Sequence, residues 1–215
     1  MLASSEHFTS LEKVFRGGTK LTYRRGEYII RPGENPNGIF FIEEGLVKAF
    51  NISKYGEENL LIIRKSQEIF PLIWAITGQE REIIYQAITP TTVRRIDRQT
   101  YLNYLHSHPL ALEPLLDMVT EMYRIHSERL LNLEYRTVRE RLASFLLTMS
   151  HRFGEEASDG IKINVPLRHQ DIASSINASR ETASRELSKM ERKGLIKTTH
   201  FIITLKDADA LAAIL

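Results

Sequence analysis

The chain has 215 residues, of which 42% are hydrophobic and 26% charged. These proportions fit one large or two ordinary globular domains and exclude disordered and collagen-like chains. The lack of cysteine excludes disulfides, thiolate nucleophiles and cysteine-ligated iron–sulfur or zinc sites. No apolar run reaches the roughly 18 residues of a spanning helix, and residues 1–9 lack the pattern of a secretory signal. We therefore expect a cytoplasmic protein with no membrane partner.

The net charge of +2 is unevenly distributed along the chain. Residues 1–135 hold 16 Lys or Arg against 17 Asp or Glu, a net charge of −1. Residues 136–206 hold 13 against 8, a net charge of +5. A basic last third is typical of nucleic-acid binding, although a solvated surface can also produce it.

Residues 20–96 carry strand signals at close spacing. Short apolar runs alternate with turns rich in Gly and Pro, such as residues 31–38, and predict a β-sandwich or β-roll. The predicted strands cover residues 28–30, 39–42, 46–50, 60–63, 85–88 and 93–96.

Helical patterns begin after Tyr101, and one apolar stripe recurs every three or four residues from 110 to 133. Such a helix either packs on its own roll or pairs two subunits. The 3.5-residue spacing over three heptads favours the subunit seam. The expected dimer interface consists of Leu112, Leu116, Val119, Met122, Tyr123, His126, Leu130 and Leu133.

The C-terminal third predicts a helix-turn-helix followed by a hairpin. A helix over 138–149 precedes a loop over 154–160 and a strand over 161–165. A short helix within 166–173 and a polar turn over 176–179 lead to a second helix from Arg180, capped by Ser179 and ended by Gly194. Strands over 195–198 and 201–204 flank Thr199 and His200. This is the layout of a winged helix-turn-helix.

The second helix of this motif carries side chains suited to reading DNA. Arginine can donate two hydrogen bonds to guanine, and glutamate can accept one from cytosine, so Arg180, Glu181 and Arg185 are candidate base-reading residues. An ordinary solvated charge face is the alternative interpretation. The candidate phosphate contacts are Arg168, Ser179, Lys189, Arg192, Lys193 and Lys197.

Residues 179–187, followed by Gly194-Leu195-Ile196, closely resemble the recognition helix of the Crp/Fnr family of bacterial transcription regulators. Residues 25–34 and 40–45 resemble landmarks of that family's β-roll. The resemblance implies an α+β fold: a jelly-roll-like β-roll in residues 1–106, a dimerisation helix in 107–135 and a winged helix-turn-helix in 136–215. It further implies a homodimer on double-stranded DNA and, for an activator, RNA polymerase as a partner.

The resemblance leaves two half-sites open. Arg180, Glu181 and Arg185 fit the pattern that reads TGTGA, whereas Glu181, Ser184 and Arg185 fit the one that reads TTGAT. We favour TGTGA because Arg180 supplies an extra guanine donor, and TGA is common to both.

The resemblance also bears on the effector. Relatives that bind cyclic AMP use a Phe-Gly-Glu segment and an Arg-Ser or Arg-Thr pair, where this chain has Phe70-Pro71-Leu72 and Arg81-Glu82. A carboxylate beside a phosphate repels it, so cyclic nucleotides are disfavoured and no cofactor is predicted. A different effector could enter a pocket formed by Trp74, Arg81, Glu82, Tyr85, His126 and Ser127.

Two other sensing chemistries of the family fit the sequence poorly. A four-cysteine iron–sulfur cluster is excluded because the chain has no cysteine. Haem is disfavoured because His7, His106, His108 and His126 are the only N-terminal histidines, and the His106–His108 pair sits at a helix boundary.

Two other classes of protein remain as alternatives. An enzyme is disfavoured because no histidine lies between His7 and His106 to form a cupin-type metal site, and nucleophile-elbow and phosphate-loop motifs are absent. A ligand-sensing or interaction module without a DNA-reading role is disfavoured by the intact Arg180, Glu181 and Arg185.

Overall fold

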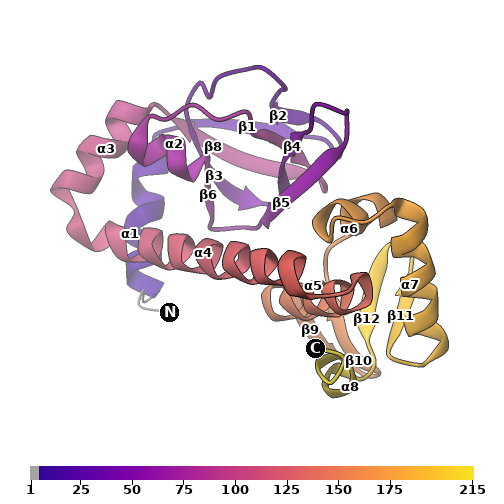
Figure 1. Cartoon of the computed structure of the whole chain (residues 1–215). Helices are drawn as coiled ribbons and strands as arrows, with labels where there is room; N and C mark the ends of the chain where they lie inside the picture. The colour runs from indigo at the N-terminus through magenta and orange to yellow at the C-terminus, as the bar shows by residue number, and fades with distance from the viewer. Residues whose placement is uncertain (1–4) are drawn as a thin grey trace. The chain divides into compact units, whose positions relative to one another are not determined.

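The computed structural model describes residues 5–215, with side chains from Thr9 onward (Figure 1). The secretory-signal prediction concerns residues 1–9, of which the first four lie outside the described part. The chain divides into two compact units. The first consists of residues up to Asn51 together with Leu61–Tyr123, and the second of Ile52–Leu60 together with Arg124–Leu215. None of the described helices is long and apolar enough to cross a bilayer.

The N-terminal part is the predicted β-roll. Two four-stranded sheets have the orders β1-β8-β3-β6 and β2-β7-β4-β5. Every predicted run from 28 to 96 contributes to one of the strands, and β1 and β6 are additional. The strand bounds are β1 Thr19–Tyr23, β2 Tyr28–Ile30, β3 Ile39–Glu44, β4 Val47–Ile52, β5 Glu58–Arg64, β6 Ile69–Phe70, β7 Ile84–Ala87 and β8 Thr91–Ile96.

Aromatic side chains fill the interior of the roll. Phe40 stacks on Phe70, and Phe70 stacks on Tyr85, with ring centroids 5.2 and 4.7 Å apart. Phe15, from a helix that the sequence did not predict, stacks on Phe41 at 5.3 Å. The helices of this part are α1 Ser5–Phe15, α2 Leu72–Thr77, α3 Arg98–Ser107 and the short 3-10 turn Pro109–Ala111.

The long helix α4 (Leu112–Tyr135) presents two apolar faces. Leu115 and Met118 are buried in the core of the first unit, next to residues such as Leu11 and Phe15. The predicted interface residues other than Met122 and His126 are exposed along the helix: Leu112, Leu116, Val119, Tyr123, Leu130 and Leu133. The helix therefore packs on the roll and also keeps an unpaired apolar face.

The second unit contains the predicted winged helix-turn-helix (Figure 1). A four-stranded sheet of order β11-β12-β10-β9 packs with helices whose apolar residues form a separate core. Its first helix begins with a capping box at Thr137, which accepts from the Glu140 N–H while the Glu140 carboxylate accepts from Thr137 N–H. The bounds are α5 Val138–Phe153, β9 Gly154–Ala157, β10 Gly160–Ile163, α6 His169–Ser175, α7 Arg180–Arg192, β11 Ile196–Thr199, β12 Ile202–Leu205 and α8 Ala208–Ala212.

Two local predictions are wrong in this unit. The segment predicted as a loop over 154–160 contains β9, which pairs with β10 in register Gly154↔Ile163. The C-terminal hairpin turns one residue later than predicted, because Thr199 pairs with Ile202. The turn residues are therefore His200 and Phe201, and Phe201 lies outside the strand.

Candidate nucleic-acid interface

Helix α7 separates a buried face from a polar one, as the sequence predicts. Ala183, Leu187 and Met190 are at most 3% exposed and anchor the helix to the second unit. Arg180 and Arg185 are exposed on its N-terminal half. Arg180 and Arg185 therefore stand on the exposed side of the N-terminal half of α7.

The first turn of α7 is ordered by its cap. The Ser179 hydroxyl oxygen accepts from the Thr182 N–H at 3.1 Å and lies 3.0 Å from the Thr182 hydroxyl. Arg185 donates from Nη2 to that same hydroxyl at 3.1 Å. The predicted N-cap role of Ser179 is confirmed, and Thr182, which the sequence analysis did not select, links the cap to Arg185, a candidate base-reading residue.

The surroundings of Glu181 lower the pKa of its carboxyl and so favour the ionised form. A hydrogen bond from its own backbone N–H and one from the Ser179 hydroxyl lower the pKa of its carboxyl, and the positive charges of Arg180 and Arg185 act in the same direction. An ionised carboxylate only accepts hydrogen bonds. This state suits a contact with the amino group of cytosine.

Two arginines from outside the helix-turn-helix, Arg141 and Arg129, donate hydrogen bonds to backbone carbonyls in and near the turn before α7. Asn177 has φ +49°, a left-handed conformation that asparagine tolerates. Arg141 of α5 donates from Nε to the Ile176 carbonyl at 2.8 Å and from Nη2 to the Asn177 carbonyl at 3.2 Å. Arg129 donates to the Ser174 carbonyl at 3.1 Å. Ser174 lies in the last turn of α6, and Ile176 and Asn177 follow that helix, so these are carbonyls that a helix end leaves without a backbone partner and that the arginines satisfy.

The candidate phosphate contacts are all exposed, but they differ in what they already bind. Arg168, at the N-terminal cap of α6, and Lys197, on β11, extend from the helix-turn-helix and the hairpin. Lys189 is paired with Glu186 at 2.7 Å. Arg192 and Lys193 lie at the C-terminal end of α7, where a cation also complements the helix dipole.

The predicted effector residues are divided between the units. Trp74, Arg81, Glu82 and Tyr85 belong to the first unit, and His126 and Ser127 belong to the second. Tyr85 is buried, and this burial raises the pKa of its hydroxyl to about 12, while the positive charges of Arg64 and Arg81 act in the opposite direction. Arg81 and Glu82 are exposed. The pocket formed by all six residues stays a prediction.

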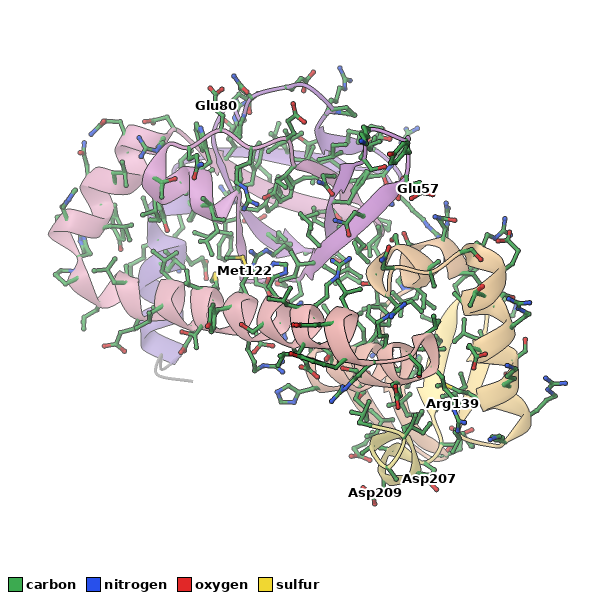
Figure 2. All side chains as sticks on the ribbon, viewed as in Figure 1. Glu57, Glu80, Met122, Arg139, Asp207 and Asp209 are labelled. Atoms are coloured by element: carbon green, nitrogen blue, oxygen red, sulfur yellow. The ribbon has the colours of Figure 1, made fainter. Side chains whose placement is uncertain are left out.

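Arg64 is a buried cation that the sequence analysis did not select. Its side chain is 5% exposed and pairs with Glu68 at 3.2 Å. Its Nη2 lies 3.4 Å from the sulfur of Met122, which points from α4 toward the roll (Figure 2). In the sequence, the one sign of this buried cation is that an arginine directly follows the apolar run 60–63. Met122 thus packs against the roll, unlike the exposed members of the predicted interface.

Of the histidines considered as haem ligands, His106 and His108 lie at the end of α3, and His126 lies within α4. The side chain of His7 lies outside the described part. His108 stacks on Tyr104 with ring centroids 4.0 Å apart, and its Nδ1 lies 2.9 Å from the Ser107 hydroxyl. Among the described residues, no group of three or more His, Cys, Asp or Glu is placed to hold a metal ion.

A β-roll followed by a long helix and a winged helix-turn-helix defines a two-domain, DNA-binding regulator. Residues 20–108 match the model of the cyclic nucleotide-binding domain, and residues 140–214 match that of the Crp-like helix-turn-helix domain. The chain belongs to the Crp/Fnr family of transcription regulators, as its sequence resemblance implied.

Relatives and solved structures agree over nearly the whole chain. The global nitrogen regulator of a Synechocystis species is 30% identical over 195 residues, which cover 89% of this chain and 86% of that protein. A CRP-like cAMP-activated global transcriptional regulator of Mycobacterium tuberculosis is 26% identical, with 88% and 85% coverage. The structure of FixK2 from Bradyrhizobium japonicum matches with a TM-score of 0.78 at 23% identity, covering 91% of this chain and 96% of that one.

Proposed function

We propose that the protein is a homodimeric transcription regulator that reads inverted TGTGA half-sites, or the related TTGAT half-sites, through α7. The observation that carries this proposal is the exposed first turn and a half of α7, where Arg180, Glu181 and Arg185 stand on a helix whose opposite face is buried. Two guanidinium forks and a carboxylate provide donors for guanine and an acceptor for cytosine. Ser184, partly buried beside them, is the fourth base-reading residue.

The dimer would form along the exposed face of α4. Leu116, Tyr123 and Leu130 recur at intervals of seven residues and are 51%, 73% and 65% exposed. Leu112, Val119 and Leu133 follow the same period in a second row. Two rows with a heptad period are the pattern of a coiled-coil seam, and a monomer would leave this apolar surface in water. In the dimer, the two recognition helices would enter major grooves about 34 Å apart.

The effector would be a compound other than cyclic AMP. Pro71 and Leu72 are buried where the cyclic-AMP-binding pattern has glycine and glutamate, and Glu82 places a second charge beside Arg81. An effector would act by shifting the population of dimers toward the half-site spacing of DNA. If the protein is an activator, RNA polymerase is its further partner.

Fluorescence anisotropy tests this function at a stated, near-physiological salt concentration, because salt changes DNA affinity by orders of magnitude. The labelled duplexes carry inverted TGTGA half-sites, inverted TTGAT half-sites or a scrambled sequence, each with and without cyclic AMP. We expect selective binding that cyclic AMP does not change. Tightening by cyclic AMP would contradict our interpretation of Pro71, Leu72 and Glu82. No selectivity under any condition would favour a ligand-sensing or interaction module.

A further inference from the structure

The buried guanidinium group of Arg64 has one edge that the protein satisfies poorly. Its Nη1 donates to the Glu68 carboxylate at 3.2 Å, and its side chain is only 5% exposed. Its Nη2 donates to the thioether sulfur of Met122 at 3.4 Å, and such a sulfur is a weak acceptor. Its Nε is buried and has no hydrogen-bond partner among the residues that the structure describes.

This edge of the guanidinium group has the geometry that binds oxyanions. Nε and Nη2 lie side by side in the plane of the group, so their N–H bonds can reach both oxygens of one carboxylate. Glu68 binds Nη1 and so leaves that edge unused. A buried charged donor without a good acceptor is costly, because it has lost its hydration. An oxyanion bound at Nε and Nη2 would remove this cost.

The charges around Arg64 favour a singly charged ligand. Burial raises the pKa of the Tyr85 hydroxyl to about 12, and the charges of Arg64 and Arg81 act in the opposite direction, so both cations lie within electrostatic reach of that hydroxyl. Glu68 offsets the charge of Arg64, and the exposed Glu82 follows Arg81 in the chain. With so little excess positive charge, the site suits one carboxylate better than a doubly charged phosphate.

The other neighbours of this site are mainly apolar. The Tyr85 ring stacks on Phe70 with ring centroids 4.7 Å apart. Met122 and Trp74 both pack against the buried core of the first unit. A small acid with an aliphatic body therefore matches both the donor edge and the side chains around it.

We propose that the roll binds a small aliphatic carboxylic acid, whose carboxylate accepts hydrogen bonds from Nε and Nη2 of Arg64 and displaces the sulfur of Met122. The inference rests on the proposed function, in which this acid is the effector, and it assigns the charged group to Arg64 instead of Arg81. Met122 belongs to α4 and points toward the roll (Figure 2), so losing its contact with Arg64 would change how α4 packs there.

Propionate is the probe for this site, and its neutral isostere propionamide is the control. The full-length protein is titrated with each compound, and with inorganic phosphate, at constant ionic strength. The fluorescence of Trp74, the only tryptophan, reports on binding, because Trp74 packs on the same core as Met122. We expect propionate to change the fluorescence saturably and to raise the temperature of thermal unfolding, and propionamide to do neither. Phosphate should bind at least about fivefold more weakly than propionate.

Three variants identify the residue that binds the carboxylate. Arg64→Lys keeps a positive charge for Glu68 but loses the planar edge, and it should bind propionate about tenfold more weakly. Arg81→Ala is the matched control, because Arg81 is exposed, and it should bind within about twofold of the wild type. Met122→Leu removes the competing sulfur and should bind propionate at least as tightly as the wild type.

The inference fails if propionate causes no saturable change, if propionamide has the same effect, or if phosphate binds as tightly as propionate. It also fails if Arg81→Ala loses more affinity than Arg64→Lys. Should Arg64→Lys not fold, weaker binding by Met122→Leu than by the wild type overturns the inference.

DNA binding by the same preparations separates this inference from the proposed function. Selective binding of the TGTGA duplex without any binding of propionate refutes the acid site alone. Propionate binding that depends on Arg64, in a protein that does not distinguish the TGTGA duplex from the scrambled one, refutes the proposed function and leaves the acid site in place.

Discussion

Arg141 should contribute measurably to the stability of the helix-turn-helix, because it holds the turn between α6 and α7. It donates to the carbonyls of Ile176 at 2.8 Å, Arg136 at 2.9 Å and Asn177 at 3.2 Å. A hydrogen bond to a charged group contributes about 1.5 to 3 kcal/mol. Asn177 is exposed, so water can replace that bond, whereas Ile176 is buried. We expect Arg141→Ala to lower the free energy of unfolding by about 2 to 3 kcal/mol.

Urea unfolding followed by far-UV circular dichroism measures this loss. The only tryptophan, Trp74, belongs to the first unit, so its fluorescence reports separately whether the roll is affected. The matched control is Arg139→Ala, since Arg139 is an exposed arginine on the same helix (Figure 2) and its loss should change the stability by less than about 0.5 kcal/mol. The reasoning is refuted if the two variants unfold within about 0.5 kcal/mol of one another.

Three further predictions concern the DNA contacts, the roll and the dimer. Arg185→Ala should cost about 1 to 3 kcal/mol on TGTGA duplexes and relax base choice, whereas Lys193→Ala should weaken binding to all sequences alike; equal losses on specific and scrambled DNA for Arg185→Ala would contradict the assignment. The hydrogen bond from Arg94 is the largest cause that lowers the pKa of Glu43, so this carboxylate should stabilise the roll above its unfolded pKa and lose that contribution as the pH falls through its folded pKa. Unfolding of Glu43→Gln at neutral pH should therefore require about 1 kcal/mol less than that of the wild type, and the two proteins should converge in acid. Tyr123→Glu, on the exposed face of α4, should shift sedimentation equilibrium toward monomer, and an unchanged dimer would move the interface elsewhere.

The elements that the sequence predicted well are those with a strong local period. The apolar residues of α7 recur at spacings of four and three, and its cap and its end are marked by Ser179 and Gly194, so its face and limits could be predicted. The segment 154–157 has no such signal. Its residues Gly-Glu-Glu-Ala have low strand propensity, and it becomes β9 because β10 lies beside it as a pairing partner.

Part of the candidate site depends on contacts between residues far apart in the chain. Arg141 reaches the carbonyl of Ile176, 35 residues away, and nothing in the spacing around Arg141 distinguishes it from the exposed Arg139. The hairpin turn was misplaced by one residue because His200 and Phe201 lack the Asn-Gly signature of a type I′ turn. A one-residue shift changes which side chains face the core, and it brought Phe201 out of the strand and onto the turn.

The long helix α4 can both pack on its own roll and pair two subunits, because different rows of its residues serve the two contacts. Each residue advances the helix by roughly 100°, so positions three apart lie roughly 60° from one another around its axis. Leu115 lies about 60° from Leu112 around the helix axis, and Met118 lies about 60° further in the same direction, so this pair faces roughly 110° away from the pair Leu112 and Leu116. Leu115 and Met118 pack into the roll, whereas Leu112 and Leu116 stay exposed. A partner helix could therefore bind to the exposed residues without displacing the roll. In a dimer of the proposed kind, an effector that rotated α4 slightly on the roll would therefore also reorient the exposed row at the subunit interface.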